Sequence, residues 1–249
     1  MQILKLVLFF ALGFLMGIPL VQYNWTCLIK ISEREEHCTF ENKYPVLSAK
    51  SLMFSFFCGA AFDLFYVIKG LNITSVIYML TALALISISL IDWMSYEIPP
   101  QFNVYIAALA VVNLVLNYKD FANYLIGSVL VSGIFLIILL ILLCLGLYVR
   151  SQLKKVTAKK ATAKGRAMGG GDIKLMFALG LLLGWQKILL VMFLGSLLGS
   201  VIHIIIMKIT GDNNRVLSFG PYLAAGALIA MNFGDYLLGL YIKYCIPQI

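Results

Sequence analysis

Charged residues are scarce in this sequence. Asp, Glu, Lys and Arg make up 12% of its 249 residues, whereas hydrophobic residues make up 62%, and the mean hydropathy is +0.96. Soluble globular domains carry about 25% charged and about 45–50% apolar residues. The composition therefore excludes an ordinary soluble domain and indicates an integral membrane protein.

The sequence also lacks the alternation of apolar and polar residues that a transmembrane β-barrel requires over strands of about ten residues. Unbroken apolar runs such as GIFLIILLILLCLGLYV suit helices instead, which need about 20 residues to cross a bilayer. The first run has no small-x-small cleavage site after it, so we expect it to remain as a helix. We predict an all-α polytopic membrane protein, a single membrane domain over residues 1–249 with about eight transmembrane helices. The runs cover residues 3–22, 50–68, 74–91, 102–118, 123–149, 173–186, 187–207 and 219–242.

Cysteines are few, and their spacing is irregular. The five lie at positions 27, 38, 58, 144 and 245, and no two of them form a C-x-x-C pair. A four-thiolate zinc site is built from such pairs, and a disulfide framework from more regular spacings. We therefore expect neither a zinc site nor a disulfide scaffold.

Positive charge is concentrated in one stretch, residues 150–166, which holds seven Lys or Arg residues and no acid. Beside transmembrane helices such an excess marks the cytoplasmic side, so we predict a basic cytoplasmic loop over residues 150–172. No aromatic residue lies among the basic ones, which argues against nucleic acid as a partner. If each run crosses the bilayer once, residues 23–49 form a second cytoplasmic loop or small subdomain, and fourteen of the 19 basic residues are cytoplasmic.

Acids are rarer still, and two of the 11 fall at the same predicted membrane boundary. Asp92 ends the third apolar run and Asp172 begins the sixth, so both are predicted at the cytoplasmic face. Prolines at 99 and 100 end the helix after Asp92. Glycines at 169–171 permit close backbone approach, and we expect Asp172 on a flexible loop beside a helix start.

Other interpretations of the acids stay open. Asp172 alone fits a helix N-cap, and Glu97 is a competing carboxylate near the same face. Asp63 lies within the second run, where a lone carboxylate needs a partner or a proton, and His203 lies within the seventh. Asp63 and His203, together with Asp92 and Asp172, also fit a transporter or channel that uses intramembrane carboxylates.

Two carboxyl groups brought together in a partly desolvated site share one proton, so that one is a base and the other an acid. The base can take a proton from a water that attacks a peptide carbonyl. The acid can hydrogen-bond the carbonyl oxygen and then protonate the leaving amine. Such a site cuts peptide bonds without a metal, a cofactor or a covalent intermediate.

At these positions the sequence resembles the prepilin leader peptidases, which belong to the GxGD class of intramembrane aspartic proteases. Their motifs are an Asp followed about seven residues later by Ile-Pro or Leu-Pro, then G-x-G-D with a lysine two residues on, then Phe-Gly-Pro opening the last span. The matching residues are Asp92, Ile98 and Pro99; Gly169, Gly171, Asp172 and Lys174, with Gly170 between the two glycines; and FGPYLAAGALIA from Phe219.

The resemblance implies that Asp92 and Asp172 are the catalytic pair of a multi-pass protein in the bacterial inner membrane. Its substrate would be a type IV prepilin or pseudopilin, cut on the cytoplasmic side between a short basic leader and an apolar helix. Many members also methylate the new N-terminus with S-adenosylmethionine. The usual pair of C-x-x-C motifs is missing here, and Ser48 stands near the place of a family glutamate. Zinc is therefore not expected, and methyl transfer is left open.

Overall fold

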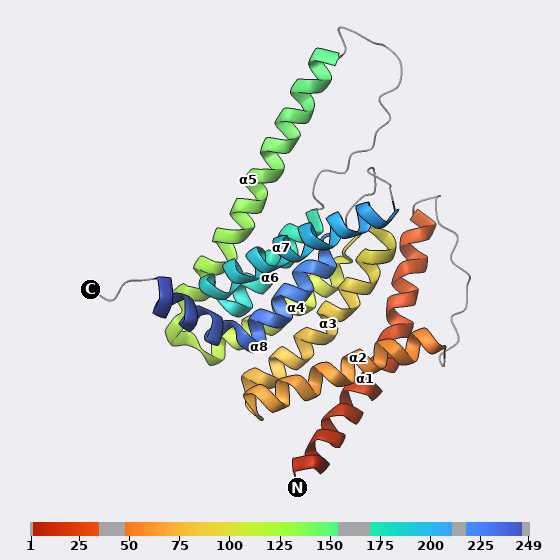
Figure 1. Cartoon of the computed structure of the whole chain (residues 1–249), viewed down its shortest axis with the longest axis vertical. Helices are drawn as coiled ribbons and strands as arrows, with labels where there is room; N and C mark the ends of the chain where they lie inside the picture. Colours follow the sequence, from red (N-terminus) through yellow and green to blue (C-terminus); the bar gives the residue numbers. More distant parts are fainter. Residues whose placement is uncertain (1, 35–47, 154–169, 211–217, 246–249) are drawn as a thin grey trace.

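The structure, a computed structural model, describes residues 2–34, 48–153, 170–210 and 218–245. Within these ranges the chain forms eight α-helices and one short 3-10 helix, without strands, which confirms the all-α prediction (Figure 1). The elements are α1 (Gln2–Arg34), α2 (Ala49–Lys69), α3 (Ile73–Ser95), α4 (Pro100–Leu116), η1 (Tyr118–Asp120), α5 (Phe121–Leu153), α6 (Gly170–Leu183), α7 (Trp185–Thr210) and α8 (Gly220–Cys245).

The helices differ in how well their lengths suit a bilayer. Among the described residues, six helices are long and apolar enough to cross a membrane: α1, α2, α3, α5, α7 and α8. The remaining two are shorter, because α4 has 17 residues and α6 has 14. At about 1.5 Å per residue, α6 spans roughly 21 Å of a hydrocarbon core about 30 Å thick. The run predicted at 173–186 is thus a helix, and its described part is shorter than the hydrocarbon core is thick.

Two helices extend into segments predicted as loops. Helix α1 continues to Arg34, so the first part of the predicted 23–49 loop is helical. Helix α5 continues to Leu153, and α6 begins at Gly170, so both ends of the predicted 150–172 loop are helical as well. The apolar runs predicted only the part of each helix that lies within the bilayer. A helix can continue beyond the bilayer through polar residues, which the runs do not include. Residues 35–47 and 154–169 lie outside the described part of the chain.

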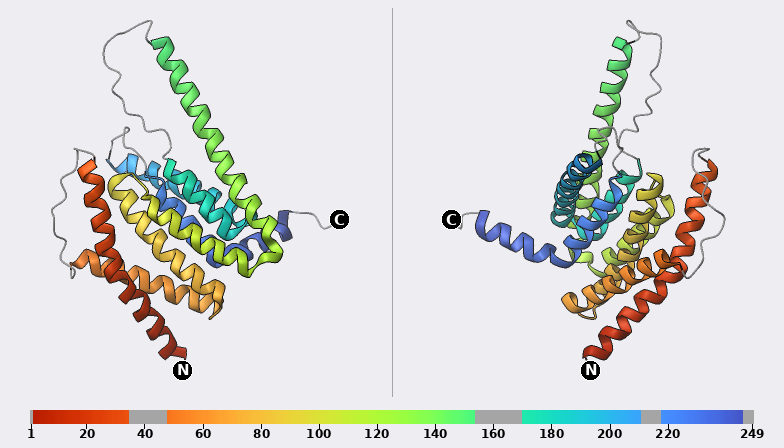
Figure 2. Two further views of the ribbon diagram at one scale, coloured as in Figure 1. Left: turned by 180° about the vertical axis from the view of Figure 1, so that it is seen from behind. Right: turned by 45° about the vertical axis from the view of Figure 1, so that its right-hand side comes forward.

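The connections between helices gather at two ends of the bundle. The end of α3 and the starts of α4, α6 and α8 lie together at one end, which we name the motif end (Figures 1 and 2). The α2–α3, α4–α5 and α6–α7 connections lie toward the other end. There the Asp235 carboxylate of α8 forms two ion pairs. Its Oδ1 lies 2.8 Å from Nζ of Lys187 in α7, and its Oδ2 lies 3.5 Å from Nζ of Lys69 in α2. Asp92 and Asp172 therefore belong to one end of the bundle, as their place in the sequence predicts.

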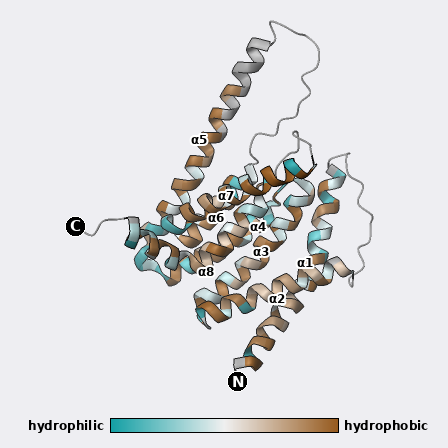
Figure 3. Cartoon of the chain, in the orientation of Figure 1, coloured by the Kyte–Doolittle hydropathy of each residue, from teal (hydrophilic) through white to brown (hydrophobic). Residues whose placement is uncertain are grey.

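Helices α3 and α6 supply much of the buried core. Helix α3 packs against α1, α2, α4 and α8, and α6 packs against α4, α5 and α7. Four large side chains of α6 are fully buried: Leu175, Met176, Leu179 and Leu182. The other helices expose many large apolar side chains, as expected of surfaces that face lipid rather than water. Figure 3 shows hydrophobic residues along the helices and hydrophilic residues gathered near their ends.

Glycine brings the backbones of α5 and α6 close together. A Cβ atom added to Gly180 of α6 would lie 2.5 Å from the carbonyl oxygen of Gly127 of α5. Gly184, with φ +81°, ends α6 and allows α7 to begin at the next residue. Membrane helices commonly pack through small residues in this way, since apolar side chains gain little by leaving lipid. The contact fixes α5 beside α6 near the end opposite the motif end.

Candidate functional site

Asp92 lies in the last turn of α3, where the chain stops being helical. Its backbone carbonyl accepts the N–H of Tyr96 at 2.9 Å, and Tyr96 adopts a left-handed conformation with φ 55°. Pro99 then caps α4, and Pro100 is its first residue. The helix break predicted from the two prolines is therefore present, and it leaves Asp92 at the motif end with a side chain only 5% exposed.

The buried Asp92 carboxylate is held by the start of α8. Its Oδ2 accepts the backbone N–H of Gly220 at 2.9 Å. This N–H belongs to the first turn of α8, where backbone donors have no partner within the helix and the helix dipole favours a negative charge. A carboxylate brought from α3 thus occupies the position that a capping side chain usually takes.

Glycine is required at position 220 by the closeness of this contact. A Cβ atom added there would lie 2.7 Å from Asp92 Oδ2 and 3.0 Å from its Cγ. These distances are too short, so the Asp92 carboxyl group or the α8 backbone would have to move. Phe-Gly-Pro therefore has a physical role in this fold, because its glycine allows the α8 backbone to reach the Asp92 carboxylate. The sequence offered the motif but not this role, which depends on α3 and α8 meeting at the motif end.

Asp172 lies in the first turn of α6, and this corrects the prediction of a flexible loop. Helix α6 begins at Gly170, so Gly170 and Gly171 are helical, while Gly169 lies outside the described residues. The Asp172 side chain is 8% exposed and faces the interior of the bundle. It interacts electrostatically with Asp92, so the structure brings together the two carboxyl groups that the sequence singled out.

The start of α6 is fixed by contacts with the α3–α4 connection and with α4. A Cβ atom added to Gly171 would lie 2.9 Å from Cβ of Ile98, whereas one added to Gly170 would meet nothing within 4 Å. Asn103 of α4 donates its Nδ2 hydrogen to the Gly171 carbonyl at 3.4 Å. Gly171 is therefore needed for close packing rather than for flexibility, and this packing sets the position of Asp172.

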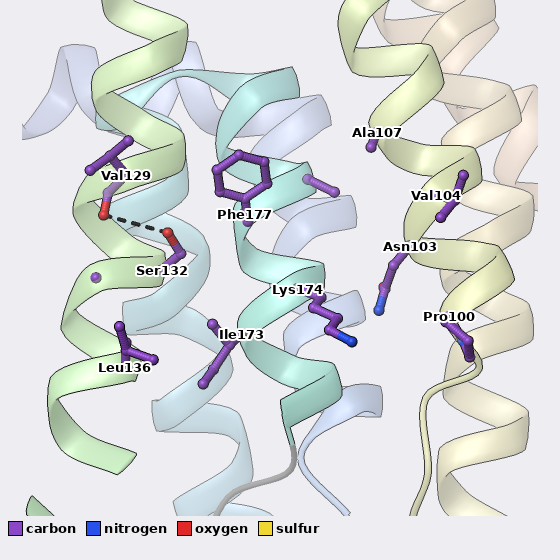
Figure 4. Close-up of a pocket in the computed structure, with 12 residues that line it drawn as sticks. Pro100, Asn103, Val104, Ala107, Val129, Ser132, Leu136, Ile173, Lys174 and Phe177 are labelled. Atoms are coloured by element: carbon purple, nitrogen blue, oxygen red, sulfur yellow. Dashed lines mark hydrogen bonds between the residues drawn. The ribbon is translucent and has the colours of Figure 1, made fainter. Parts of the chain in front are cut away.

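Lys174 lies on the opposite face of α6 from Asp172. It is exposed and lines an apolar groove of about 580 Å³ whose floor is α6 and whose walls are α4 and α5 (Figure 4). Asn103 lines the same groove near Lys174. The lysine of the G-x-G-D-x-K pattern thus faces the groove and not the paired carboxyl groups.

The other singled-out residues occupy different places. Glu97 is half-buried in the α3–α4 connection, where Ser95 Oγ approaches its backbone carbonyl at 3.5 Å. Asp63 is half-buried on α2, and its Oδ1 atom has no hydrogen-bond partner. His203 is half-buried on α7. Of the described acids, the one that interacts electrostatically with Asp172 is Asp92.

Possible metal ligands are dispersed in the described residues. No three His, Cys, Asp or Glu side chains there lie together so as to hold a metal ion. Cys27 and Cys58 are buried free thiols, and Cys144 is an exposed one. Cys38 lies outside the described residues. The expectation that the chain binds no zinc therefore rests on the sequence alone.

Fold and site together define a class: a polytopic helical membrane protein with two buried carboxyl groups that interact electrostatically at one end of its bundle. Residues 79–204 match the Type IV leader peptidase family, and this stretch includes both Asp92 and Asp172. The match covers half of the chain, and the chain belongs to this family.

Individual proteins similar to this chain have names that agree with the family match. A prepilin leader peptidase/N-methyltransferase of Legionella pneumophila is 40% identical over 78 residues, which are 31% of this chain and 27% of the relative. One of Pseudomonas aeruginosa is 35% identical over 92 residues, 36% of this chain and 30% of the relative. One of Aeromonas hydrophila is 41% identical over 76 residues, 30% of this chain and 26% of the relative. The chain thus matches less than a third of each relative's length. No solved structure gives a significant match.

Proposed function

We propose that this chain is a membrane aspartic endopeptidase in which Asp92 and Asp172 are the catalytic residues. The observation that carries the proposal is the pair of buried carboxyl groups at the motif end, with one of them bound to the first N–H of α8. A pair of this kind is expensive to bury without a purpose, because two adjacent carboxylates repel each other and lose hydration. Membership of the Type IV leader peptidase family supports the same activity.

The contacts suggest which carboxyl group carries which role. The Gly220 N–H and the α8 dipole favour negative charge on Asp92, so Asp92 is the base. It takes a proton from water as the water oxygen attacks the peptide carbonyl carbon. Asp172, protonated beside it, donates a hydrogen bond to the carbonyl oxygen. When the tetrahedral intermediate collapses, the C–N bond breaks and the leaving nitrogen receives a proton from the pair.

The substrate in this proposal is a type IV prepilin or pseudopilin, cut between its short basic leader and its apolar helix. The relatives' names support a prepilin, and the apolar helices of this chain support a substrate that is itself embedded in a lipid bilayer. Cleavage on the cytoplasmic side of the bacterial inner membrane follows if the basic stretch at 150–166 is cytoplasmic. Proteolysis by two carboxyl groups requires no metal or organic cofactor.

Methyl transfer to the new N-terminus is a second candidate activity, supported by the relatives' names. Its donor would be S-adenosylmethionine. The family match begins at residue 79, after the segment that lacks the C-x-x-C pairs. Incubating cleaved substrate with labelled S-adenosylmethionine separates the two outcomes: label on the new N-terminus supports a dual enzyme, and its absence limits the chain to proteolysis.

The proteolytic proposal is tested by co-expressing a prepilin-like substrate and following its electrophoretic shift. Asp92→Asn and Asp172→Asn should each abolish the shift, because each removes one partner of the acid–base pair. Glu97→Gln is the control, since it neutralises a third carboxyl group at the motif end, which is half-buried whereas Asp92 and Asp172 are buried. Cleavage that survives both Asp→Asn changes would refute the mechanism. Proton-coupled uptake that is lost in the same variants would favour a transporter instead.

A further inference from the structure

The groove between α4, α5 and α6 has two chemically different parts. The rest of its lining is mainly apolar and includes Val104, Val129 and Phe177, while the Ser132 hydroxyl donates to backbone carbonyls of α5. Its end near the start of α4 and α6 carries Asn103 and Lys174 (Figure 4). The polar part thus lies at the motif end, and the apolar part extends along the helices.

Asn103 is buried, and only one of the two polar atoms of its side-chain amide has a hydrogen-bond partner. The side chain is 6% exposed; Nδ2 donates to the Gly171 carbonyl, while Oδ1 has no hydrogen-bond partner. A buried acceptor without a donor is costly, by about 1–3 kcal/mol in general. A group that pairs with Asn103 Oδ1 must therefore supply an N–H or O–H hydrogen.

The polar end of the groove lies beside the catalytic pair along α6. Asp172 faces the interior of the bundle, and the next residue, Ile173, lines the groove. A chain that leaves the groove at its polar end therefore needs to pass only around the first turn of α6 to reach the carboxyl groups. Asn103 ties this same turn to α4 through Gly171.

We infer that this groove binds the apolar helix of the membrane substrate, and that Asn103 Oδ1 accepts a backbone N–H of the substrate where its helix gives way to the cleaved segment. The inference rests on the proposed proteolytic function and adds the place where substrate is held. A lipid acyl chain would fit the apolar part, but the acyl chain itself carries no N–H for Asn103. An apolar peptide helix supplies side chains for the apolar part and backbone N–H groups for Asn103. It also supplies carbonyl groups to which the Lys174 ammonium can donate. Asn103 is a positioning residue in this account.

Photocrosslinking tests where the substrate lies. Benzoylphenylalanine replaces Val104 of α4 or Val129 of α5, which are 69% and 64% exposed and line the groove. Ile204 of α7, 53% exposed and not in the groove, is the matched control. With a full-length prepilin-like substrate and enzyme that cleaves it, the two groove positions should crosslink several-fold more than the control. Cleavage with equal or stronger crosslinking at Ile204 would overturn the inference and leave the proteolytic proposal intact, whereas no cleavage by the unaltered enzyme would refute that proposal.

A second experiment tests the role of Asn103 separately from folding. A series of synthetic substrates each has one backbone amide near the cleavage site replaced by an ester, which removes one N–H donor. One ester should raise KM and lower kcat/KM of the unaltered enzyme about 5- to 10-fold, the usual contribution of one hydrogen bond. The same ester should have no effect on Asn103→Ala, because its acceptor is gone. If every ester has the same effect on both enzymes, Asn103 only ties α4 to α6 and the inference is wrong.

Discussion

The sharpest prediction concerns a single methyl group at position 220. In Gly220→Ala the new Cβ would lie 2.7 Å from Asp92 Oδ2, and Asp92 is nearly fully buried, so either the carboxylate or the α8 backbone must move. Movement weakens the 2.9 Å hydrogen bond from the Gly220 N–H. A hydrogen bond to a charged acceptor contributes about 1.5–3 kcal/mol, and about 1.4 kcal/mol corresponds to a factor of ten in rate. We therefore expect kcat/KM for prepilin cleavage to fall about 10- to 100-fold.

The assay needs a variant that separates this local effect from a general effect of alanine in α8. Gly239→Ala provides it, because a Cβ atom there meets nothing within 4 Å in the same helix. Both variants should reach the membrane in normal amounts, and Gly239→Ala should cleave at the unaltered rate. Gly220→Ala that cleaves within twofold of the unaltered enzyme would show that this contact does not matter for catalysis.

Three further predictions follow from packing and from the proposed chemistry. Gly171→Ala should greatly reduce cleavage, because its Cβ would lie 2.9 Å from Ile98 Cβ, whereas Gly170→Ala should cleave normally; equal activity of the two would contradict the packing argument. Gly180→Ala places a Cβ 2.5 Å from the Gly127 carbonyl oxygen and should therefore destabilise the fold by about 1–3 kcal/mol. Its unfolding temperature in detergent should be lower than that of the control Gly133→Ala, whose Cβ meets nothing within 4 Å. Strong chelators should leave cleavage unchanged, and its loss with recovery on adding zinc would refute a metal-free mechanism.

The general architecture could be predicted from the sequence because membrane helices have a strong signal. Apolar runs predicted every helix, and the prolines at 99 and 100 predicted the end of helical structure after Asp92. The distribution of Lys and Arg predicted that Asp92 and Asp172 share one end of the bundle. Both residues lie at the motif end, Asp92 at the end of α3 and Asp172 at the start of α6. Helix lengths were harder to predict, since polar residues extend α1 and α5 beyond their apolar runs.

The details of the site depend on contacts between distant segments, which a sequence pattern does not reveal. Glycines before Asp172 suggested flexibility, yet Gly171 is helical and packs tightly on Ile98. Gly220 was visible in a motif, but its bond to Asp92 joins residues 128 apart in the chain. Asn103 had no signal at all, because a single Asn in an apolar helix does not show which of its amide atoms will find a partner.

The central claim is that Asp92 and Asp172 act as one acid–base unit. Its most direct test is the cleavage rate of a prepilin-like substrate by purified Asp92→Asn, Asp172→Asn and the double variant, in the same lipid or detergent. Residues that act as a unit are not additive, so each single variant should lose at least about 100-fold and the double variant should lose no more than either. Substantial cleavage by either single variant, or losses that multiply in the double variant, would contradict the claim.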